Sequence, residues 1–564
     1  MQPLRLLALT AILQGSSVLG AECSGSFDAI TAKDFTAKLD PGWNLGNTLD
    51  ATPDEGSWNN APVEESTLDY AKSAGFKSVR LPVTWTHHFT SESPDWTVDS
   101  EWLQRVSDVV DMITSRDLYT LVNVHHDSWE WADVTQSDAN QTMIEEKFYR
   151  LWYQIGTKLA CTSSLVAFES INEPPCETAE DGAKVNRFNE IFLKAINDAG
   201  GFNPQRVVNL VGGGSDSEKT SQWFELPANI TNPYAIQFHF YSPYDFIFSA
   251  WGETIWGSDA DKAEIETTLD LIRGNFTDVP LVLGEYDASP TNTEPAARWK
   301  YHEHLVRTAA KYDISTILWD NGLDHLDRTS GTWRDPTSIS IITTSESNSL
   351  PDSTEDASAT SQWSSAYIFL KVGDEVTDQK LPYLFNGNTL TSISDEKGTA
   401  LAADAYAVSS DAITFSSTYL STLDTTNPGI LATLTLEFSA GASPTLQIVQ
   451  WDTPSLSSTS AAASSVSGSD LSIPITWKGL SKPAAVKALT SSGTYLFDDW
   501  TQYLGPLQQA RATYNNQWNW DEENVILTSA AIDAVVAAGE DTVFTFEFYP
   551  RVDESNAVNF TLTV

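Results

Sequence analysis

The sequence is poor in cysteine and in positive charge. Three cysteines in 564 residues exclude a disulfide-rich scaffold. Lysine and arginine total 32 against 76 aspartates and glutamates, so the formal net charge is −44. A field of this sign repels phosphate backbones and anionic lipids. Nucleic acid and membrane surfaces are therefore not expected as partners, and the substrate should be neutral.

Long apolar runs are also missing, and none reaches the roughly 20 residues that a membrane-spanning helix needs. The N-terminal segment instead has the parts of a secretory signal: Arg5, an apolar stretch from Leu6 to Leu13, and small residues from Gly15 to Ala21. We expect removal of residues 1–21 and a secreted, extracellular protein, with a monomer as the expected state. Four N-glycosylation sequons give secondary support and begin at Asn140, Asn229, Asn275 and Asn559.

The few cysteines still predict one bridge. Cys161 and Cys176 flank an expected strand at opposite ends, which separates them by roughly 25 Å at the rise of an extended chain. A disulfide cannot span that distance. Of the two remaining pairings, the sequence predicts Cys23 with Cys161 and a free Cys176, because the N-terminal segment and the helix end before this strand should both lie where the strand begins.

Aromatic residues, in contrast, are abundant, at 11% of the chain with 20 tryptophans. Flat indole rings suit the flat apolar faces of sugar rings, although many tryptophans will belong to cores. The hydrophobic fraction of 41% is ample for packed cores. A chain of 564 residues is too long for one core, so two to four domains are expected.

Short apolar runs alternate with amphipathic helical patterns from Trp43 to about Gly322. Eight strands alternating with helices predict an α/β fold, a (β/α)₈ TIM barrel over residues 22–347. A doubly wound open sheet is the alternative, but the glycines at 212–214 do not continue as the GxGxxG phosphate loop of that fold. The eight runs begin at Trp43, Ser78, Thr120, Val166, Arg206, Ala235, Leu281 and Ser315.

Composition changes after the barrel. Residues 348–365 are rich in serine, threonine and aspartate and are predicted to be a linker. Alternating apolar residues then predict a small β-sandwich over 366–453. A serine- and alanine-rich stretch, 454–469, is predicted to be a second linker, and 470–564 a C-terminal carbohydrate-binding β-sandwich.

The segment VAFESINEPP, from Val166 to Pro175, is the strongest functional signal. It begins as a buried strand and ends in Asn172-Glu173 before two prolines. A carboxylate at the end of a buried strand is costly unless it has a task. Glu285 ends the seventh run, nearly opposite the fourth in a barrel, so the two carboxylates can face each other as glycoside hydrolysis requires.

Other strand ends carry side chains that suit such a site. Arg80 and the imidazoles can keep Glu285 ionised, and Trp319 offers an apolar platform for a sugar ring. A metal site of three histidines is the alternative, but adjacent histidines on a strand point to opposite faces, so no metal or other cofactor is expected. The strand-end residues are Asn44, Arg80, His125, His126, Asn172, His239, Tyr241 and Trp319.

Taken in order, the motifs WNLGNTLDA, RLPVTW, VNVHHD, INEP, HFYSP, GEY and LWDNG resemble glycoside hydrolase family 5, the cellulase-type clan of retaining barrel enzymes. The resemblance covers about Asp40 to Thr344 and implies that Glu173 is the acid/base and Glu285 the nucleophile. GEY replaces the commoner GEFG, and Asp287 adds an acid close to the nucleophile. The resemblance also implies substrate-binding positions at Arg80, His125, Asn172, His239, Tyr241 and Trp319, with Asn44, His126 and Trp131 as further subsite residues.

WNLGNTLDA and HHDSWEW look most like subfamily 4 of that family. This implies a secreted endo-β-1,4-glucanase that cleaves cellulose-type or mixed-linkage β-glucan by double displacement. A xyloglucanase or mannanase of the same family is one alternative. A non-catalytic cell-wall-binding protein is another, although binding alone needs no opposed carboxylates.

The two C-terminal modules also carry resemblances. The middle one, with LFNGNTLTSI and LEFSAGA, resembles the immunoglobulin-like X2 module. The last one resembles carbohydrate-binding module family 46 and concentrates tryptophan and tyrosine. Trp518 and Trp520 lie two residues apart in the polar stretch YNNQWNWDEEN. They are therefore predicted to share one exposed face that stacks on sugar rings.

Overall fold

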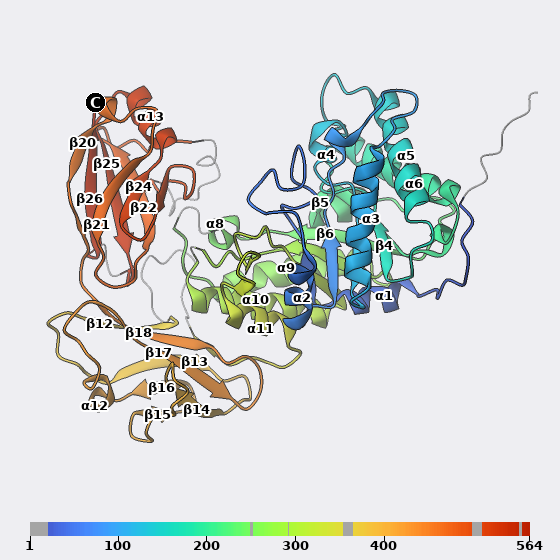
Figure 1. Cartoon of the computed structure of the whole chain (residues 1–564). Coiled ribbons are helices and arrows are strands. Elements are labelled where there is room, and N and C mark those ends of the chain that lie inside the picture. Colours follow the sequence, from blue (N-terminus) through green and yellow to red (C-terminus); the bar gives the residue numbers. More distant parts are fainter. Residues whose placement is uncertain (1–20, 249–251, 292, 353–364, 499–509, 552–554) are drawn as a thin grey trace, which may run out of the picture.

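In the computed structural model the chain forms an eight-stranded barrel followed by two small β-modules (Figure 1). The structure describes residues 21–248, 252–291, 293–352, 365–498, 510–551 and 555–564. The barrel strands pair in parallel in chain order, and β1 pairs with both β2 and β8 to close the ring. The strands are β1 (Gly42–Asn44), β2 (Ser78–Leu81), β3 (Tyr119–Val122), β4 (Val166–Glu169), β5 (Val208–Asp216), β6 (Tyr234–Phe240), β7 (Leu281–Tyr286) and β8 (Ile314–Leu318). The predicted (β/α)₈ barrel is confirmed.

Helices cover the outside of the barrel because each presents an apolar stripe to the strands. The helix α6 begins with a capping box, in which Thr178 and Asp181 satisfy each other's backbone N–H groups. The predicted alternation of strands with amphipathic helices is confirmed. The main outer helices are α2 (Glu65–Ser73), α3 (Ser100–Thr114), α5 (Gln141–Lys158), α6 (Ala179–Ala199), α7 (Ser217–Trp223), α9 (Asp259–Asn275), α10 (Pro295–Lys311) and α11 (Pro336–Thr343).

A helix before the first strand closes the bottom of the barrel. Helix α1 (Ala32–Leu39) buries Phe35 and Leu39 against residues at the starts of the strands, among them Ala167 and Val282. The ends of the strands are left open on the opposite side. The short elements α4 (Asp127–Glu130), α8 (Tyr244–Ile247), β9 (Leu326–Asp327) and β10 (Thr332–Trp333) lie in the loops that follow those strand ends.

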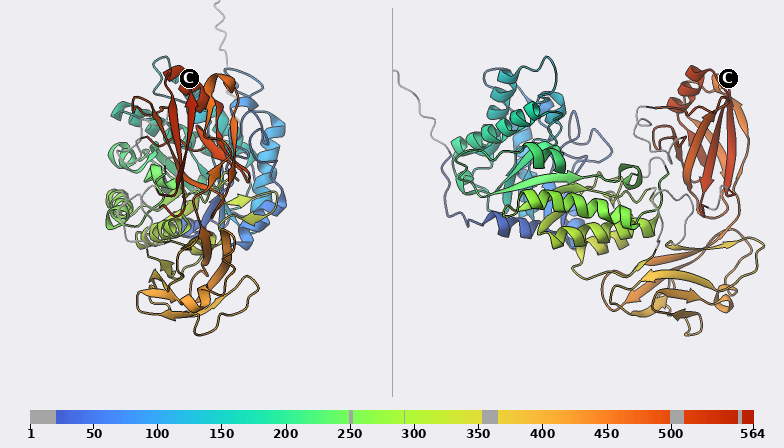
Figure 2. Two further views of the ribbon diagram at one scale, coloured as in Figure 1. Left: turned by 90° about the vertical axis from the view of Figure 1, so that its left-hand side faces the viewer. Right: turned by 180° about the vertical axis from the view of Figure 1, so that it is seen from behind.

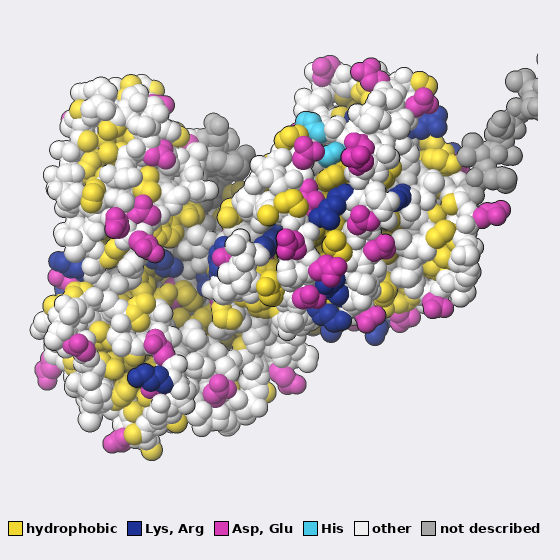
Figure 3. All heavy atoms as spheres, viewed as in Figure 1, with side chains coloured by type: hydrophobic (Ala, Val, Ile, Leu, Met, Phe, Trp, Pro, Cys, Tyr) yellow, Lys and Arg dark blue, Asp and Glu magenta, His cyan; other side chains and the backbone are white. Residues whose placement is uncertain are grey.

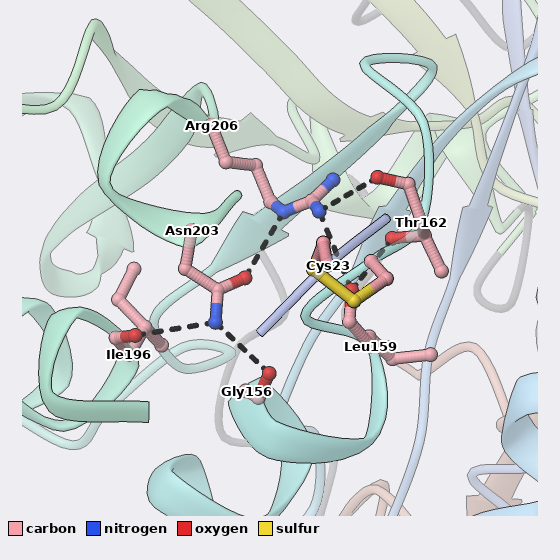
Figure 4. Close-up of a disulfide and its surroundings, with 8 residues drawn as sticks. Cys23, Gly156, Leu159, Thr162, Ile196, Asn203 and Arg206 are labelled. Carbon is pink, nitrogen blue, oxygen red and sulfur yellow. Dashed lines mark hydrogen bonds between the residues drawn. A yellow bond between two sulfur atoms is a disulfide. The ribbon is translucent and has the colours of Figure 1, made fainter. Parts of the chain in front are cut away.

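One disulfide ties the N-terminal segment to the barrel (Figure 4). Cys23 bonds Cys161, and Cys176 is free and buried, as predicted. Arg206 lies beside the bridge and donates to the carbonyls of Leu159 and Thr162, where α5 has ended. These contacts are at the start of β4, whereas Glu173 follows its end. The bridge therefore lies at the face of the barrel opposite the predicted site.

Each C-terminal module is a pair of four-stranded sheets around its own apolar core. The middle module pairs β11-β13-β16-β15 with β12-β18-β17-β14. Its elements are β11 (Leu350–Pro351), β12 (Tyr367–Lys371), β13 (Gln379–Leu384), β14 (Leu390–Ser394), β15 (Tyr406–Val408), β16 (Ala412–Phe415), α12 (Ser417–Leu420), β17 (Gly429–Phe438) and β18 (Thr445–Trp451). The predicted small β-modules are confirmed.

The last module pairs β19-β21-β24-β23 with β20-β26-β25-β22. It also contains a helix that the sequence analysis did not predict, α13, which covers part of its core. Its elements are β19 (Ser455–Leu456), β20 (Ser460–Ala462), β21 (Leu471–Thr476), β22 (Pro483–Thr490), β23 (Trp518–Trp520), β24 (Asn524–Leu527), α13 (Ser529–Ala538), β25 (Thr542–Phe548) and β26 (Ala557–Thr563).

The stretch predicted as the second linker has a different role. Within 454–469, β19 pairs with β21 and β20 pairs with β26, so this stretch belongs to the last module. Its serines and alanines suggested a spacer, but backbone hydrogen bonds to distant strands decide the structure. In the first predicted linker, 348–365, Leu350 and Pro351 pair with β13 of the middle module. Residues 353–364 of that linker lie outside the described part of the chain.

Figure 2 shows the middle module below both the barrel and the last module, and side-chain contacts join the three parts. Trp299 and Ile341 of the barrel share a small apolar cluster with Leu350 and Ala442. Val449 of the middle module packs with Leu480 and Tyr549 of the last one. The last module also reaches the barrel directly through Arg551. Among the described residues, no helix has the length and apolar character needed to cross a membrane.

Candidate active site

The ends of the barrel strands bring the predicted carboxylates together. Glu285 is near the end of β7, and Glu173 follows β4. One oxygen of each carboxylate and the nearer ring nitrogen of His239 all lie within 4.8 Å of one another. Residues 112 positions apart in the sequence therefore form a single pair, because β4 and β7 lie nearly opposite in the closed ring.

Glu285 is held by three neighbouring side chains. Its Oε1 accepts from Arg80 Nη1 at 2.6 Å, and its Oε2 accepts from the Tyr241 hydroxyl at 2.8 Å. His239 Nδ1 is 3.7 Å from Oε2. Burial raises the pKa of Glu285, while His239 and Arg80 favour the charged form. Burial, reinforced by the charge of Glu285, raises the pKa of Tyr241 well above its usual value, so this phenol stays a hydrogen-bond donor.

Glu173 has a more open setting and a backbone that is held from the neighbouring strand. Its side chain is 25% exposed, and its φ of +40° lies in the left-handed region that residues other than glycine rarely adopt. The Glu173 N–H donates to Ser215 Oγ, and Gly214 N–H donates to the carbonyl of Pro174. Bonds from the end of β5 thus fix the turn that directs Glu173 toward the site.

His239 connects the two carboxylates. Its Nδ1 is 2.7 Å from Glu173 Oε1, and its Nε2 faces the Gln237 amide nitrogen at 3.4 Å. The Gln237 carbonyl oxygen accepts from Asn209, so its NH₂ group faces the ring. This arrangement makes Nε2 the acceptor and Nδ1 the donor to Glu173.

Arg80 is the buried centre of the polar network. Its guanidinium is fully buried and donates to Asn44 Oδ1, Asn172 Oδ1 and Glu285, and two further bonds go to Glu169. Glu169 is not among the residues predicted for the site. The signal was present, because an acidic residue within the apolar run VAFES is as costly to bury as the strand-end Glu173.

His125 and Trp319 form one wall of the site. Their rings are nearly parallel, with centroids 5.9 Å apart. Burial, with His126 and Arg80 nearby, holds the pKa of His125 well below its usual value, so the ring is neutral. Gly46 lies under Trp319, and a Cβ there would come within 2.7 Å of the indole. The half-buried indole therefore requires a glycine beneath it.

His126 belongs to an aromatic group that the sequence analysis only partly found. Its ring packs between Trp58 and Trp129, at centroid distances of 5.4 and 4.8 Å. Trp58 and Trp129 are 40% and 51% exposed, and Trp129 Nε1 donates to the Glu173 carbonyl. These two tryptophans present open apolar faces beside the carboxylate pair.

Two residues predicted to bind substrate face elsewhere. Trp131 donates to Asp127 and packs against Lys147, whose ammonium lies 4.3 Å from the ring centre. Residues 129 and 131 of HHDSWEW lie on different faces of α4 and its end, so Trp129 rather than Trp131 bonds the Glu173 carbonyl. Asn44 is fully buried and bonds Arg80 and the carbonyls of Gly284 and Leu318, so it supports the site from below.

The prediction for the last module needs a correction at Trp518. This residue is fully buried, donates to the Ala512 carbonyl and belongs to the apolar core. Trp520, its predicted partner on an exposed face, is half-buried and packs with Trp518 and Tyr514. Trp500 and Tyr503, the other aromatic candidates nearby, lie outside the described residues. A polar sequence around a tryptophan did not indicate exposure here, because α13 and β24 cover it.

Two groups of side chains have the spacing of metal ligands in the part of the chain that the structure describes. One is Glu173, His239 and Glu285, and the other is Asp50, His125 and His126. The three-histidine alternative is not one of these groups. In the first group His239 Nδ1 is already hydrogen-bonded to Glu173 Oε1. In the second, the backbone N–H groups of Asn47 and Thr48 donate to Asp50.

A barrel with paired carboxylates at its strand ends defines a class of glycoside hydrolase, and comparison with known proteins agrees. Residues 43–325 match the profile of the cellulase family, glycosyl hydrolase family 5, and residues 362–448 match carbohydrate binding domain X2. The chain belongs to glycosyl hydrolase family 5. The resemblance of the middle module to X2 is confirmed as well.

Known relatives share the whole three-part architecture. Endoglucanase B of Paenibacillus lautus is 27% identical over 576 residues, which cover 99% of this chain and 95% of that protein. The crystal structure of a tri-modular subfamily 4 endo-β-1,4-glucanase from Bacillus licheniformis superimposes with a TM-score of 0.84 at 32% identity, covering 94% of this chain and all of that one. That enzyme has also been solved with cellotetraose. A family 5 xyloglucanase from Paenibacillus pabuli is 27% identical, with a TM-score of 0.52 over 54% of this chain and 98% of that one.

Proposed function

We propose that this protein is a secreted endo-β-1,4-glucanase that hydrolyses β-glucan with retention of anomeric configuration. The observation that carries the proposal is that one carboxylate oxygen of Glu173 and one of Glu285 lie within 4.8 Å of each other. Retaining enzymes hold their carboxyl groups about 5–5.5 Å apart, whereas inverting enzymes separate them by about 6.5–9.5 Å to admit a water. The short separation favours direct attack by one carboxylate.

The surroundings assign a role to each carboxylate. Glu285 bonds Arg80 and Tyr241, which stabilise its charge, so it is the nucleophile that attacks the anomeric carbon. Glu173 is more exposed and bonds only His239 through its side chain among the described residues, so it is free to exchange a proton. Protonated Glu173 donates to the leaving oxygen and then deprotonates the water that releases the glycosyl-enzyme.

The substrate follows from the walls of the site and from the relatives. Trp319, Trp58 and Trp129 present apolar faces that suit the flat rings of a β-linked glucan. The net charge of −44, with Asp and Glu side chains spread over the face shown in Figure 3, disfavours anionic polysaccharides. The cellotetraose complex of the Bacillus licheniformis enzyme supports β-1,4-linked glucose as the backbone. Xyloglucan is the second candidate because of the similarity to the xyloglucanase.

Proton NMR of the first product tests the mechanism. A β-anomer released from β-glucan is the expected result, and an α-anomer would contradict the assignment of Glu285. A reducing-sugar assay on cellulose, mixed-linkage glucan, xyloglucan and mannan then separates the glucanase from the xyloglucanase and mannanase alternatives. Release of no sugar from any of them would favour the non-catalytic alternative.

The last module is proposed to extend the substrate-binding surface. Arg551 Nη1 donates to the Gly252 carbonyl and to Thr254 Oγ1, both in the loop after β6, and its Nη2 donates to Glu547 of its own module. Burial, with the charge of Asp324 in the loop after β8 as the next cause, raises the pKa of Tyr514 to about 12. Figure 3 shows an indentation between this module and the barrel.

The contact of Arg551 gives a test in the full-length chain. Arg551→Ala should lower activity on polymeric β-glucan several-fold and leave an aryl cellobioside unaffected, because only long substrates reach the module. Arg551→Lys, which keeps one donor and the charge, should recover part of the polymer activity. Wild-type rates on polymer in Arg551→Ala would contradict a role for the placement of this module.

A further inference from the structure

The polar network under the catalytic pair contains a carboxylate with no role in the reaction as proposed. Glu169 is near the end of β4, four residues before Glu173, and is fully buried. An ionised carboxylate in a barrel interior costs several kcal/mol unless it is paired and hydrogen-bonded. Its pKa is nonetheless lowered: burial raises it, but Arg80 and Asn123 more than offset that effect.

Glu169 fixes the plane of the Arg80 guanidinium. Its two oxygens accept from Nε and Nη2 of Arg80, both at 2.7 Å, which is the bidentate geometry that locks an arginine fork. The orientation of that plane then sets the directions of the other N–H groups of Arg80. Nη1 reaches Glu285 at 2.6 Å and Asn44 at 2.9 Å, and Nη2 reaches Asn172 at 2.8 Å. All five N–H groups of Arg80 have an acceptor.

Glu169 also determines which ring nitrogen of His125 carries the proton, and it does so through the side chain of Asn123. Asn123 Oδ1 accepts from the Val83 N–H, which identifies its other atom as the NH₂ group. That NH₂ group donates to Glu169 Oε1 at 3.0 Å and lies 3.0 Å from His125 Nδ1. His125 Nδ1 is therefore an acceptor, so the proton of the neutral ring is on Nε2.

We infer that Glu169 is a positioning residue for catalysis, which holds Arg80 against the nucleophile and fixes the donor nitrogen of His125. It touches neither substrate nor reacting atoms and acts through Arg80 and Asn123. This inference rests on the proposed function, because it takes Glu285 as the nucleophile. Glu169 also has an electrostatic effect. It offsets part of the positive charge of Arg80, so Arg80 stabilises the anionic form of Glu285 less strongly. Stronger stabilisation of that anion would make Glu285 a weaker nucleophile.

The sign of the pH effect follows from the groups that face Glu285. These are Arg80 from β2, His239 and Tyr241 from β6, and Glu173 after β4. Loss of the Glu169 charge removes a negative charge near Glu285. It also leaves the positive charge of Arg80 without the opposing charge of Glu169. Both changes favour ionised Glu285, so its pKa falls and the acidic limb of kcat/KM moves to lower pH.

The experiment compares Glu169→Gln and Glu169→Asp with wild type on one soluble β-glucan. Glu169→Gln should lower kcat by about 100-fold, because small displacements of a catalytic group are this costly. The acidic limb of its kcat/KM profile should move to lower pH by about one unit. Glu169→Asp keeps the charge but is one methylene shorter, so its kcat should fall while its acidic limb stays in place.

Asp335→Asn is the matched control. Asp335 and Arg298 form another buried ion pair, 2.7 Å from Nε to Oδ2, between α10 and the start of α11. Its loss should lower thermal stability without moving the acidic limb. A folded Glu169→Gln with wild-type kcat or an unmoved limb would overturn the inference. If that variant does not fold, wild-type kcat in Glu169→Asp would overturn it.

Failure of this inference is distinguishable from failure of the proposed function. An α-anomer from the wild-type enzyme would contradict the proposed function and needs no Glu169 variant. Retained activity in the Glu169 variants would contradict the positioning role while the wild-type product still has the β-configuration.

Discussion

At the scale of residues, the two carboxylates differ in how their charge is supported. Glu285 is buried and bonded to a guanidinium and a phenol, whereas Glu173 is partly exposed and bonds an imidazole through its side chain. A nucleophile needs stabilised charge, and a general acid needs a proton that it can lose and regain. The surroundings therefore distinguish two residues of the same type.

Substitution of each carboxylate should give a different kinetic pattern. Glu285→Ala should lose roughly 10⁴-fold or more in kcat on every substrate, because no covalent intermediate forms. Glu173→Ala should retain the first step on aryl glycosides with good leaving groups, which need little protonation. Steady-state kinetics on a dinitrophenyl cellobioside and on cellotetraose measure both. Equal losses on the two substrates for Glu173→Ala would mean that the roles are wrongly assigned.

Gly46 should control the position of Trp319. A Cβ at this residue would lie 2.7 Å from the indole and 3.0 Å from the Asp320 carbonyl, so Gly46→Ala must displace the ring. We expect KM to rise several-fold and the free energy of unfolding to fall by about 1–3 kcal/mol. Gly274→Ala is the control, because nothing lies within 4 Å of its Cβ and α9 gains up to about 1 kcal/mol from alanine. Wild-type KM in Gly46→Ala would contradict this prediction.

At the scale of elements, the barrel separates stability from chemistry. The disulfide and α1 lie at the starts of the strands, and the carboxylates lie at their ends. Barrel enzymes in general place their active sites at the carboxyl ends of the strands. Changes at the closed end should therefore alter stability without altering the reaction.

The disulfide gives a direct test of this separation. Cys23 and Cys161 are 138 residues apart, so their bridge strongly restricts the unfolded chain. Cys23→Ser with Cys161→Ser should lower the free energy of unfolding by roughly 2–5 kcal/mol and leave kcat unchanged at 25 °C. Thermal unfolding and initial rates measure the two effects. Thiol titration of denatured, unreduced wild type should find one free thiol, that of Cys176.

At the scale of the whole molecule, three separate cores are joined by contacts of different kinds. The barrel and the middle module share apolar side chains, whereas Arg551 supplies polar contacts between the barrel and the last module. Polar contacts of buried groups depend on their protonation. The position of the last module should therefore be the part of the architecture that is most sensitive to pH.

Glu253 is the group that should report this sensitivity. Burial, reinforced by Asp245 and opposed by Arg551, raises its pKa to about 9. A raised carboxyl pKa gives stability that is present at low pH and is lost as pH rises toward 9. The free energy of unfolding should therefore decrease by about a few kcal/mol from pH 5 to pH 9. In Glu253→Gln this decrease should be smaller. Parallel pH profiles for wild type and variant would contradict the prediction.

Features that depend on local pattern could be predicted from the amino-acid sequence alone. Alternating runs gave the eight strands and the main helices, because the period of apolar residues directly reflects strand or helix geometry. The ends of those runs gave Glu173, Glu285, Arg80, His239 and Tyr241, since the ends of parallel strands converge in any closed barrel. The length of an extended strand excluded a Cys161–Cys176 bridge, and the expected position of the N-terminus near the start of the fourth strand indicated the Cys23–Cys161 bridge.

Which side chains are covered and which face the site depends on how the folded chain packs. Trp518 is buried and Trp129 is exposed because of helices and strands that pack on them or leave them open, and neither outcome is local in sequence. Serines and alanines at 454–469 form strands because distant strands supply hydrogen bonds. Glu169 owes its place under the catalytic pair to Arg80, 89 residues away. The physical reason is that burial and hydrogen-bond partners are properties of packed neighbours, which a chain acquires only when it folds.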